Sequence, residues 1–324
     1  MRRFILYIAL LSGLTAATTS CERRDMFNEN NGVYLHLTID TLITNYTVRT
    51  LPETMRVAIY DADTKALRSY DFVGPEGGYI NVTPGNYDIL VYNFGTEATA
   101  IRNDAAWNDI EAYTNPVSRF LLTNVAVCFA KNREDKPTRP SRPEGEVVAY
   151  MPDHLWVARC RDVQIPVRVE GEVMTIEAEA KTVVESWTVS VHTVKGMQYV
   201  RSVSALITNM SEGNRIALNS RSTTPVTVYF DMDKDKDEAG SRLTGRFETF
   251  GKLAGQSSVL SVVVTDTSGG QYQYDFDVTD QFADNPAQQL IIETDIDIPE
   301  PSQGGGGFNP KVDEWEDISK DIDL

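Results

Sequence analysis

The sequence predicts an all-β protein made of two tandem β-sandwich domains. Hydrophobic and polar residues alternate in nearly every informative window, as expected for strands that bury one face. Turn-forming residues separate these windows, and a charged, proline-rich stretch divides them into two halves. The 324 residues suffice for about two domains.

The first 20 residues are typical of a bacterial export signal. Arg2 and Arg3 precede an apolar run over residues 4–14, and small residues lead into Cys21. The run is too short to span a bilayer. A cysteine at this place resembles the lipobox of bacterial lipoproteins, so we expect residues 1–20 to be removed and Cys21 to hold the chain on the lipid bilayer through its acyl chains. A soluble secreted protein with an incidental thiol at Cys21 is the alternative.

The segment after Cys21 and the overall charge bear on location and partners. Residues 21–32 are polar and suit a short tether. The net charge is −17, which argues against a nucleic-acid partner and predicts a surface repelled by anionic headgroups. We expect an outer-membrane protein that faces the cell surface, with the choice of leaflet left open.

The first domain is expected over residues 33–130. Its strands are expected at residues 33–40, 55–60, 79–82 and 87–94. Pro84, Gly85 and Asn86 predict a tight turn before the last of these. Residues 104–113 are expected to form a connecting helix, because Asp104 suits its N-cap and two apolar residues lie three apart on one face.

The second domain is expected over residues 147–298, after a linker or long loop at residues 131–146 that contains three prolines and many charges. Its strands are expected within residues 182–194, 203–207, 226–230, 259–264, 272–278 and 290–298. The sequence at residues 268–270, Ser-Gly-Gly, predicts a hairpin.

The C-terminal tail, residues 299–324, has a different composition. Four successive glycines predict a flexible spacer, and the acidic segment after them carries apolar residues that a plain disordered tail would lack. The tail either folds back onto the second domain or docks on another protein. The candidate docking residues are Phe308, Val312, Trp315 and Ile318.

Nothing in the sequence indicates an enzyme or a cofactor. The three histidines are scattered, and His154 with Cys160 does not complete a zinc set. Residues 231–238 alternate aspartates, but lysine and arginine occupy the positions where a calcium loop needs glycine and glutamate, so a solvated acidic loop is favoured and no metal is expected. Glu177 and Glu179 share a strand face, where solvent-facing carboxylates are more common than a hydrolase pair.

Two further points stay open from the residues alone. Cys128 and Cys160 are permitted to pair in an oxidising compartment, but a buried free thiol is at least as consistent with the sequence. Tyr229, Tyr272 and Tyr274 could stack on sugars if exposed, yet all three are also ordinary strand residues.

Several short motifs together resemble one family. They are the export segment ending at Cys21, the opening strand at 33–40, and the sequences at 82–88 (VTPGNYD), 91–93 (VYN), 203–213 (VSALITNMSEG), 308–310 (FNP) and 315–317 (WED). In this order they resemble the fimbrillin-like lipoproteins of Bacteroidetes, and more narrowly a family of such lipoproteins whose domain has no assigned function.

The resemblance implies two transthyretin-like, Greek-key sandwiches and a role in a pilus or as an adhesin. In polymerising relatives an arginine-specific protease removes the first strand, and a C-terminal segment of another subunit fills the groove. Here that strand would be residues 33–40, the cut would follow Arg49, and the donor would follow residue 307. A chain that stays lipidated and uncut could anchor or cap a fibre but could not offer its own groove.

We therefore expect a non-enzymatic surface lipoprotein of fimbrillin type, whose partners are the bilayer and other pilus subunits or a host or glycan ligand. The alternative is a glycan-binding outer-membrane lipoprotein that serves nutrient uptake.

Overall fold

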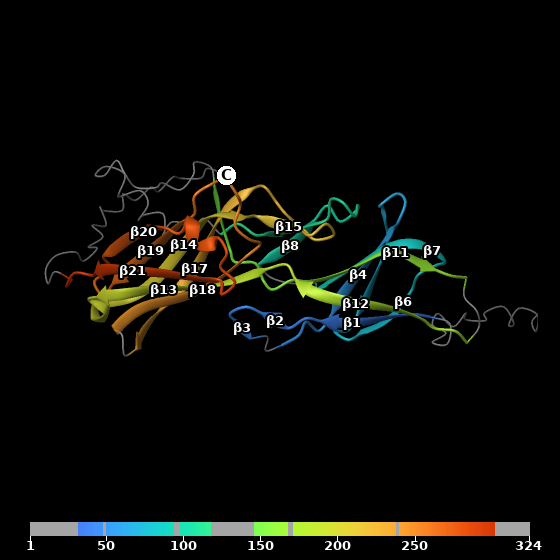
Figure 1. Cartoon of the computed structure of the whole chain (residues 1–324), viewed down its shortest axis with the longest axis horizontal. Coiled ribbons are helices and arrows are strands. Elements are labelled where there is room, and N and C mark those ends of the chain that lie inside the picture. The colour runs from blue at the N-terminus through green and yellow to red at the C-terminus, as the bar shows by residue number, and fades with distance from the viewer. Residues whose placement is uncertain are drawn as a thin grey trace, which may run out of the picture. The chain divides into compact units, whose positions relative to one another are not determined.

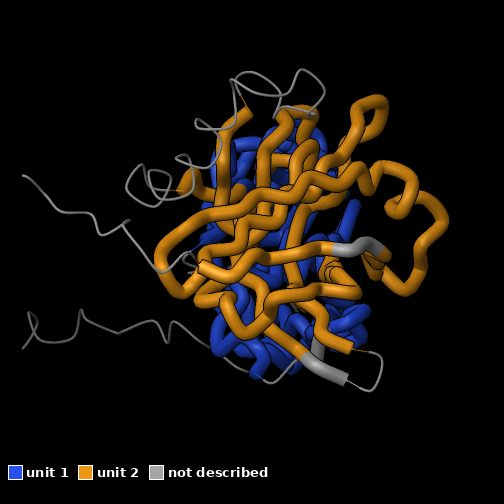
Figure 2. Tube along the Cα trace, turned by 90° about the vertical axis from the view of Figure 1, so that its left-hand side faces the viewer, with its two compact units in different colours: residues 1–113, 153–184, 213–221 blue, residues 114–152, 185–212, 222–324 orange. Residues whose placement is uncertain are grey.

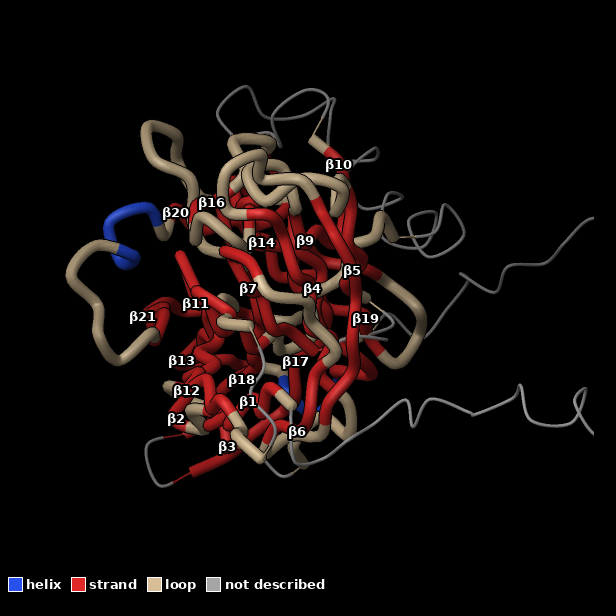
Figure 3. The backbone as a smooth tube through the Cα atoms, turned by 90° about the vertical axis from the view of Figure 1, so that its right-hand side faces the viewer, coloured by secondary structure: helices blue, strands red, loops and turns tan. Residues whose placement is uncertain are grey.

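The structure, a computed structural model, describes residues 32–47, 50–93, 98–117, 146–167, 171–237 and 240–301. Strands dominate these residues (Figure 3), which confirms the all-β prediction. The chain divides into two compact units (Figure 2). Unit 1 contains residues 1–113, 153–184 and 213–221, and unit 2 contains residues 114–152, 185–212 and 222–324.

Unit 1 is built on a seven-stranded sheet (Figure 1). Its strands, in sheet order, are β5 (Leu67–Val73), β4 (Met55–Asp61), β7 (Gly85–Asn93), β11 (Trp156–Ile165), β12 (Met174–Thr182), β1 (Val33–Ile39) and β6 (Gly77–Ile80). The two strands at the ends of this order, β5 and β6, follow one another in the chain and are joined by a turn with a bridge between Gly74 and Gly77. The sheet therefore curls back on itself around one hydrophobic core.

The other face of this sheet packs against a smaller layer. That layer contains the strands β8 (Thr99–Arg102), β9 (Glu111–Thr114), β15 (Gly213–Arg215) and β16 (Ser220–Arg221). Tyr60 of β4 contacts it, because its ring meets that of Trp107 edge-on at 5.5 Å and its hydroxyl donates to the carbonyl of Asp104 at 3.0 Å. A two-stranded hairpin, β2 (Leu42–Ile43) and β3 (Tyr46–Thr47), follows β1.

The expected helix at residues 104–113 is wrong, because this segment forms turns and then β9. Tertiary contacts determine its conformation. The amide of Trp107 donates to the carbonyl of Lys65 at 2.9 Å, and the Asp104 carboxylate accepts the hydroxyl of Tyr70 at 2.6 Å instead of capping a helix. Trp107 and Ile110 are buried, as their apolar character suggested, but in the smaller layer of unit 1.

Unit 2 contains the second large sheet. Its strands, in sheet order, are β20 (Gln271–Asp277), β19 (Val259–Asp266), β14 (Val200–Ser211), β17 (Pro225–Asp237), β18 (Gly240–Thr249), β13 (Glu185–Lys195) and β21 (Gln289–Asp297), with β10 (Val147–Ala149) beside β17. Alternate residues of these strands form one apolar cluster around Trp187, Phe230 and Phe247. Two short 3₁₀ turns, η2 (Met197–Tyr199) and η3 (Thr279–Phe282), precede β14 and β21.

The acidic segment at residues 231–238 was expected to be a loop. It is instead largely part of β17. This strand continues to Asp237 and pairs antiparallel with β18, with Asp233 opposite Thr244 and Asp235 opposite Arg242. The Arg242 guanidinium donates to the Asp235 carboxylate at 2.6 Å. Asp231, Asp233 and Asp235 share one face of this strand, and Lys234, on the opposite face, donates to the carbonyl of Val200 at 2.8 Å.

The two units interleave along the chain, whereas the expected domains were contiguous at residues 33–130 and 147–298. β11 and β12 come late in the sequence, yet β11 pairs with β7 and β12 pairs with β1 in unit 1. Alternation shows that a strand has a buried face but not which sheet it joins, so the sequence could not place these two strands. The expected linker, residues 131–146, lies outside the described residues except for Glu146.

Candidate functional site

The site residues singled out from the sequence fall mainly outside the described residues. This holds for Cys21, for Arg49 and for the four tail residues Phe308, Val312, Trp315 and Ile318. The strand expected to be removable in polymerising relatives is described, as β1. Its seat in unit 1 is therefore the candidate site that the structure can show.

β1 is an inner strand of the unit 1 sheet and is hydrogen-bonded on both sides. It runs parallel to β12, with Val33 opposite Met174 and Ile39 opposite Ala180. On the other side it runs antiparallel to β6, with Val33 opposite Ile80. Figure 1 shows β1 beside β12. Removal of β1 would therefore expose backbone groups of two strands at once.

The side chains of β1 alternate as predicted. Val33, Leu35 and Leu37 are at most 3% exposed and pack into the unit 1 core. Burial of each such side chain contributes roughly 1.5–3 kcal/mol. On the outer face, His36 Nδ1 lies 2.5 Å from a carboxylate oxygen of Glu177 on β12. Three buried apolar side chains thus help to hold β1 in place.

Backbone contacts fix both ends of β1. At its start, the amide of Met174 donates to the carbonyl of Gly32 at 3.2 Å. At its end, the Asp40 amide donates to the carbonyl of Ala180 at 2.8 Å, and the Asp40 carbonyl accepts the indole N–H of Trp156 at 3.0 Å. The strand is therefore held along its whole length.

Gly77 of β6 allows the close approach of β6 to β1. Its φ of +102° favours glycine, and a Cβ built on it would lie 1.9 Å from the carbonyl oxygen of Leu35. No other residue fits here without moving the backbone. The seat of β1 therefore depends on one glycine that the sequence analysis did not single out.

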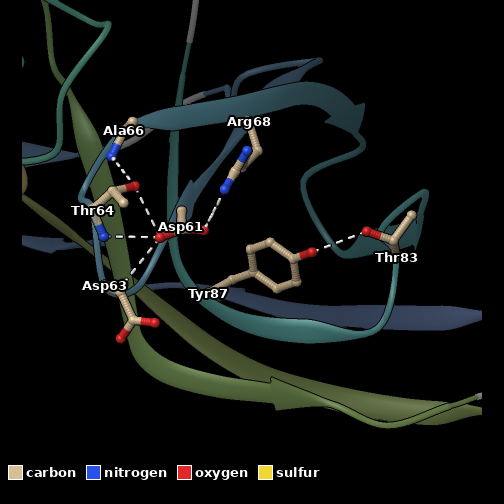
Figure 4. Close-up of polar contacts among 7 residues, drawn as sticks. All are labelled: Asp61, Asp63, Thr64, Ala66, Arg68, Thr83 and Tyr87. Atoms are coloured by element: carbon tan, nitrogen blue, oxygen red, sulfur yellow. Dashed lines mark hydrogen bonds and ion pairs between the residues drawn. The ribbon is translucent and has the colours of Figure 1, made fainter.

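The motif at residues 82–88, part of the family resemblance, forms a polar end of unit 1 (Figure 4). Tyr87 points from β7 toward Thr83, and their hydroxyls lie 2.9 Å apart. Asp88, the next residue, is fully buried; its carboxylate accepts the Lys65 ammonium at 2.5 Å and the Asp162 amide at 3.0 Å. The motif therefore joins the connection before β7 to that strand, and it contains a buried carboxylate that Lys65 neutralises.

Asp61, at the end of β4, organises the adjoining turn (Figure 4). One of its carboxylate oxygens accepts the amide of Thr64 at 2.8 Å and the Thr64 hydroxyl at 2.9 Å, and the other accepts Arg68 at 2.6 Å. The hydrogen bond from Arg68, followed by those from Thr64, holds the pKa of Asp61 well below its usual range. Both carboxylate oxygens of Asp61 are thus used to hold this turn.

The segment that contains His154 and Cys160 makes contacts within the protein fold. The Asp153 carboxylate accepts the amide of Ala98 at 2.8 Å, and the ring of His154 lies 5.8 Å from that of Trp156. Cys160 is a free thiol whose burial raises its pKa, while Cys128 lies outside the described residues. Among the described residues, no group of three or more His, Cys, Asp or Glu side chains is placed to hold a metal.

Each of the two carboxylates on β12 contacts a basic side chain. Glu177 contacts His36 at 2.5 Å, and Glu179 contacts Lys181 at 3.0 Å. Both carboxylates are more than half exposed on the solvent face of the strand. They match the solvent-facing interpretation of this alternation.

The three tyrosines considered as a sugar platform pack against apolar clusters. Tyr272 and Tyr274 pack on the core of unit 2, and Tyr229 packs on a smaller cluster that includes Leu206. Burial raises the pKa of Tyr229 to about 12, helped by the hydrogen bond of 2.8 Å that its hydroxyl donates to Asp231. All three side chains are half-buried, with one side packed on the protein and part of their surface left exposed.

Fold and site together define an all-β protein of two sandwich-like units in which the first strand is an integral inner strand. Comparison with known proteins then gives the family. The chain belongs to the family described as a domain of unknown function, DUF5119, whose model matches residues 20–231. The membership expected from the sequence motifs is confirmed.

The proteins similar to this chain include one curated relative and several solved structures. A proposed fimbrium anchoring subunit of Bacteroides ovatus is 25% identical over 240 residues, which are 74% of this chain and 63% of the relative's length. The crystal structure of a proposed adhesin from Bacteroides ovatus has a TM-score of 0.58 at 22% identity and covers 88% of this chain and 99% of its own. It confirms the fold. The fimbrial anchor protein of Porphyromonas gingivalis has a TM-score of 0.47 at 13% identity, over 81% of this chain and 89% of its own.

Proposed function

We propose that this chain is a non-enzymatic, lipid-anchored surface protein that takes part in a fimbrium as an anchoring or accessory subunit. The similarity to a fimbrium anchoring subunit over 74% of the chain supports a pilus-associated role. The chain spans only 63% of that relative's length. Assembly with other pilus subunits is therefore proposed for this chain and is not taken over from the relative.

The seat of β1 is the observation that carries the proposal. A subunit that receives a donor strand must have an empty groove, but here β12 and β6 are both paired with the chain's own β1. The indole of Trp156 and the carbonyl of Ala180 both hydrogen-bond to the backbone of Asp40, directly after β1. A protein that keeps this strand cannot accept a donor at this place, which fits a subunit at the end of a fibre.

Anchoring at Cys21 completes the proposal. Three acyl chains on this cysteine would hold the protein firmly, because each buried methylene contributes about 0.8 kcal/mol. Among the described residues, no helix is long and apolar enough to cross a membrane. We place the protein on the outer membrane, facing the cell surface, with its lipid in the bilayer and its folded units outside.

The test is the intact mass of protein extracted from host membranes, alongside protease treatment of whole cells. We expect a mass that begins at acylated Cys21, and loss of the protein when intact cells are treated. A mass that begins at Thr50 would show that β1 is removed and would overturn the anchoring role. Arg49→Lys is the matched variant, because an arginine-specific cut at this position would disappear in it.

A second measurement addresses the fimbrial role separately. Chemical cross-linking on whole cells should join this chain to pilus subunits in the wild type. The variant Cys21→Ser should lose membrane attachment. An uncut, surface-exposed lipoprotein that cross-links to no pilus subunit would retain the anchor and contradict the fimbrial part.

A further inference from the structure

A side-chain amide occupies the outer edge of β21, the last strand of unit 2. Among the described residues, β21 pairs with β13 and lies at one end of the sheet order. On its other side, the carboxamide of Gln281, from η3, makes two hydrogen bonds to Ile291. Its Nε2 donates to the Ile291 carbonyl at 3.0 Å, and its Oε1 accepts the Ile291 amide at 2.8 Å. Gln281 thus supplies the donor and acceptor that a neighbouring strand would supply.

A second amide extends this cover. Asn285 Nδ2 donates to the carbonyl of Gln289 at 2.8 Å and to that of Gln281 at 2.8 Å. Phe282 holds the same segment in place, because its ring lies 4.6 Å from that of Trp187 on β13. Residues 281–285, the edge cover, therefore occupy the beginning of the β21 edge.

The far end of the edge is also occupied. The hydroxyl of Tyr274 on β20 donates to the carbonyl of Asp297 at 3.1 Å. The part of β21 that another strand could pair with is thus the part around Ile291 that the edge cover protects. Unpaired edge strands are templates for pairing with another chain.

We propose that the edge of β21 is a self-pairing surface, closed in the monomer by the edge cover, whose occupant when opened is the same edge of a second copy of this chain. In an antiparallel pair centred on Ile291, the two Ile291 residues exchange two N–H···O bonds. The Ile291 amide and carbonyl that would make these bonds are the two groups that the Gln281 carboxamide now binds. The proposal is independent of the fimbrial role.

Charge favours this register over its neighbour. Pairing centred on Ile291 places Glu293 opposite Gln289, so no like charges meet across the pair. A shift that centres the pair on Glu293 would set two glutamates against each other, which is destabilising. The Ile291 side chain is 40% exposed, so the favoured register also brings two apolar side chains together.

The test uses the mature chain with Cys21→Ser, so that lipid does not drive association, and measures its mass by sedimentation over a range of concentrations. We expect a monomer for this chain. In Gln281→Ala the Ile291 amide should exchange hydrogen at least ten-fold faster. In Gln281→Ala/Phe282→Ala, which removes the hydrogen bonds to Ile291 and the ring contact with Trp187, a dimer should form as concentration rises. Gln273→Ala is the matched control, because the Gln273 amide donates to the Asp275 carboxylate and not to an edge backbone group.

Addition of Ile291→Pro to the double variant should restore the monomer. Proline removes the N–H that faces outward and leaves the bonds to β13, which use the neighbouring residues, in place. A folded double variant that stays monomeric, or a dimer that survives Ile291→Pro, would overturn the proposal. If Phe282→Ala does not fold, Phe282→Leu takes its place in the double variant. A monomer in that variant, or a dimer that survives Ile291→Pro, would again overturn the proposal.

Discussion

The indole Nε1 of Trp156 donates a hydrogen bond of 3.0 Å to the backbone carbonyl of Asp40. Trp156 begins β11 and is 5% exposed, and Asp40 follows β1 directly. The amide of Trp156 is itself bound to the side-chain oxygen of Asn93 at 2.8 Å. Three segments that are distant in the sequence are therefore joined at the end of β1.

We expect Trp156→Phe to lower the free energy of unfolding by about 1–2 kcal/mol. Phenylalanine retains much of the apolar burial but leaves the Asp40 carbonyl without its indole donor. Urea denaturation measures the change. Trp187→Phe is a useful control, because its indole donates to the partly exposed Glu185 carboxylate, which water can solvate. Equal losses in the two variants would argue against a special role for the Asp40 bond.

Gly77→Ala should be the most damaging single methyl addition in unit 1, with a loss of about 3 kcal/mol or more. The new Cβ would collide with the Leu35 carbonyl, and alanine is strained at the positive φ of Gly77. Gly78→Ala is the matched control, because its nearest contact would be 3.4 Å from a methyl of Val73. Thermal unfolding of the pair should separate them clearly, and similar melting temperatures would contradict the close packing of β6 on β1.

The faces of individual strands could be predicted from the sequence. Val33, Leu35 and Leu37 were expected on one side of a strand and are buried there. The tight turn expected at Pro84, Gly85 and Asn86 is only a bend at Pro84, because Gly85 and Asn86 already belong to β7. Alternation acts within a few residues, so a single sequence contains enough information to assign the faces of a strand.

Pairing between strands could not be predicted in the same way. His36 meets Glu177 across 141 positions of sequence, and no local pattern marks either residue for the other. The Gln281 carboxamide is a comparable case, since a glutamine in a short turn has no signal that it seals an edge. Asp104 shows the opposite problem, because its residue type is common at helix N-caps but no helix forms here and its carboxylate accepts the Tyr70 hydroxyl.

Asp88→Asn should destabilise the protein by about 2–3 kcal/mol. The Asp88 side chain is 1% exposed and neutralises the Lys65 ammonium, so the variant leaves that charge without its counterion. Lys65 is 35% exposed, and water reduces the loss below that of a fully buried pair. A double-mutant cycle with Lys65→Met measures the coupling by chemical denaturation.

The control for this pair is Glu179→Gln. Glu179 and Lys181 form an ion pair in which both side chains are more than half exposed. Exposed pairs contribute about 0–1 kcal/mol, so this variant should be close to wild type. A coupling between Asp88 and Lys65 as small as that of the exposed pair would show that the buried carboxylate does not depend on its lysine.

Asp61 should give the stability of unit 1 a dependence on acid pH. Its pKa is lower in the folded protein than in the unfolded chain, chiefly because Arg68 and then Thr64 hydrogen-bond the carboxylate. The unfolded chain therefore takes up a proton first as pH falls, at an ordinary aspartate pKa of about 3.9. The contribution is complete above that pH and is lost as pH falls toward the folded pKa.

The stability advantage of wild type over Asp61→Asn should thus shrink between pH 5 and pH 2, as measured by urea denaturation at each pH. Asp63→Asn removes the same charge two residues away and leaves the bond to Arg68 intact, so its difference from wild type should change less over this range. An Asp61→Asn curve parallel to wild type would contradict the lowered pKa.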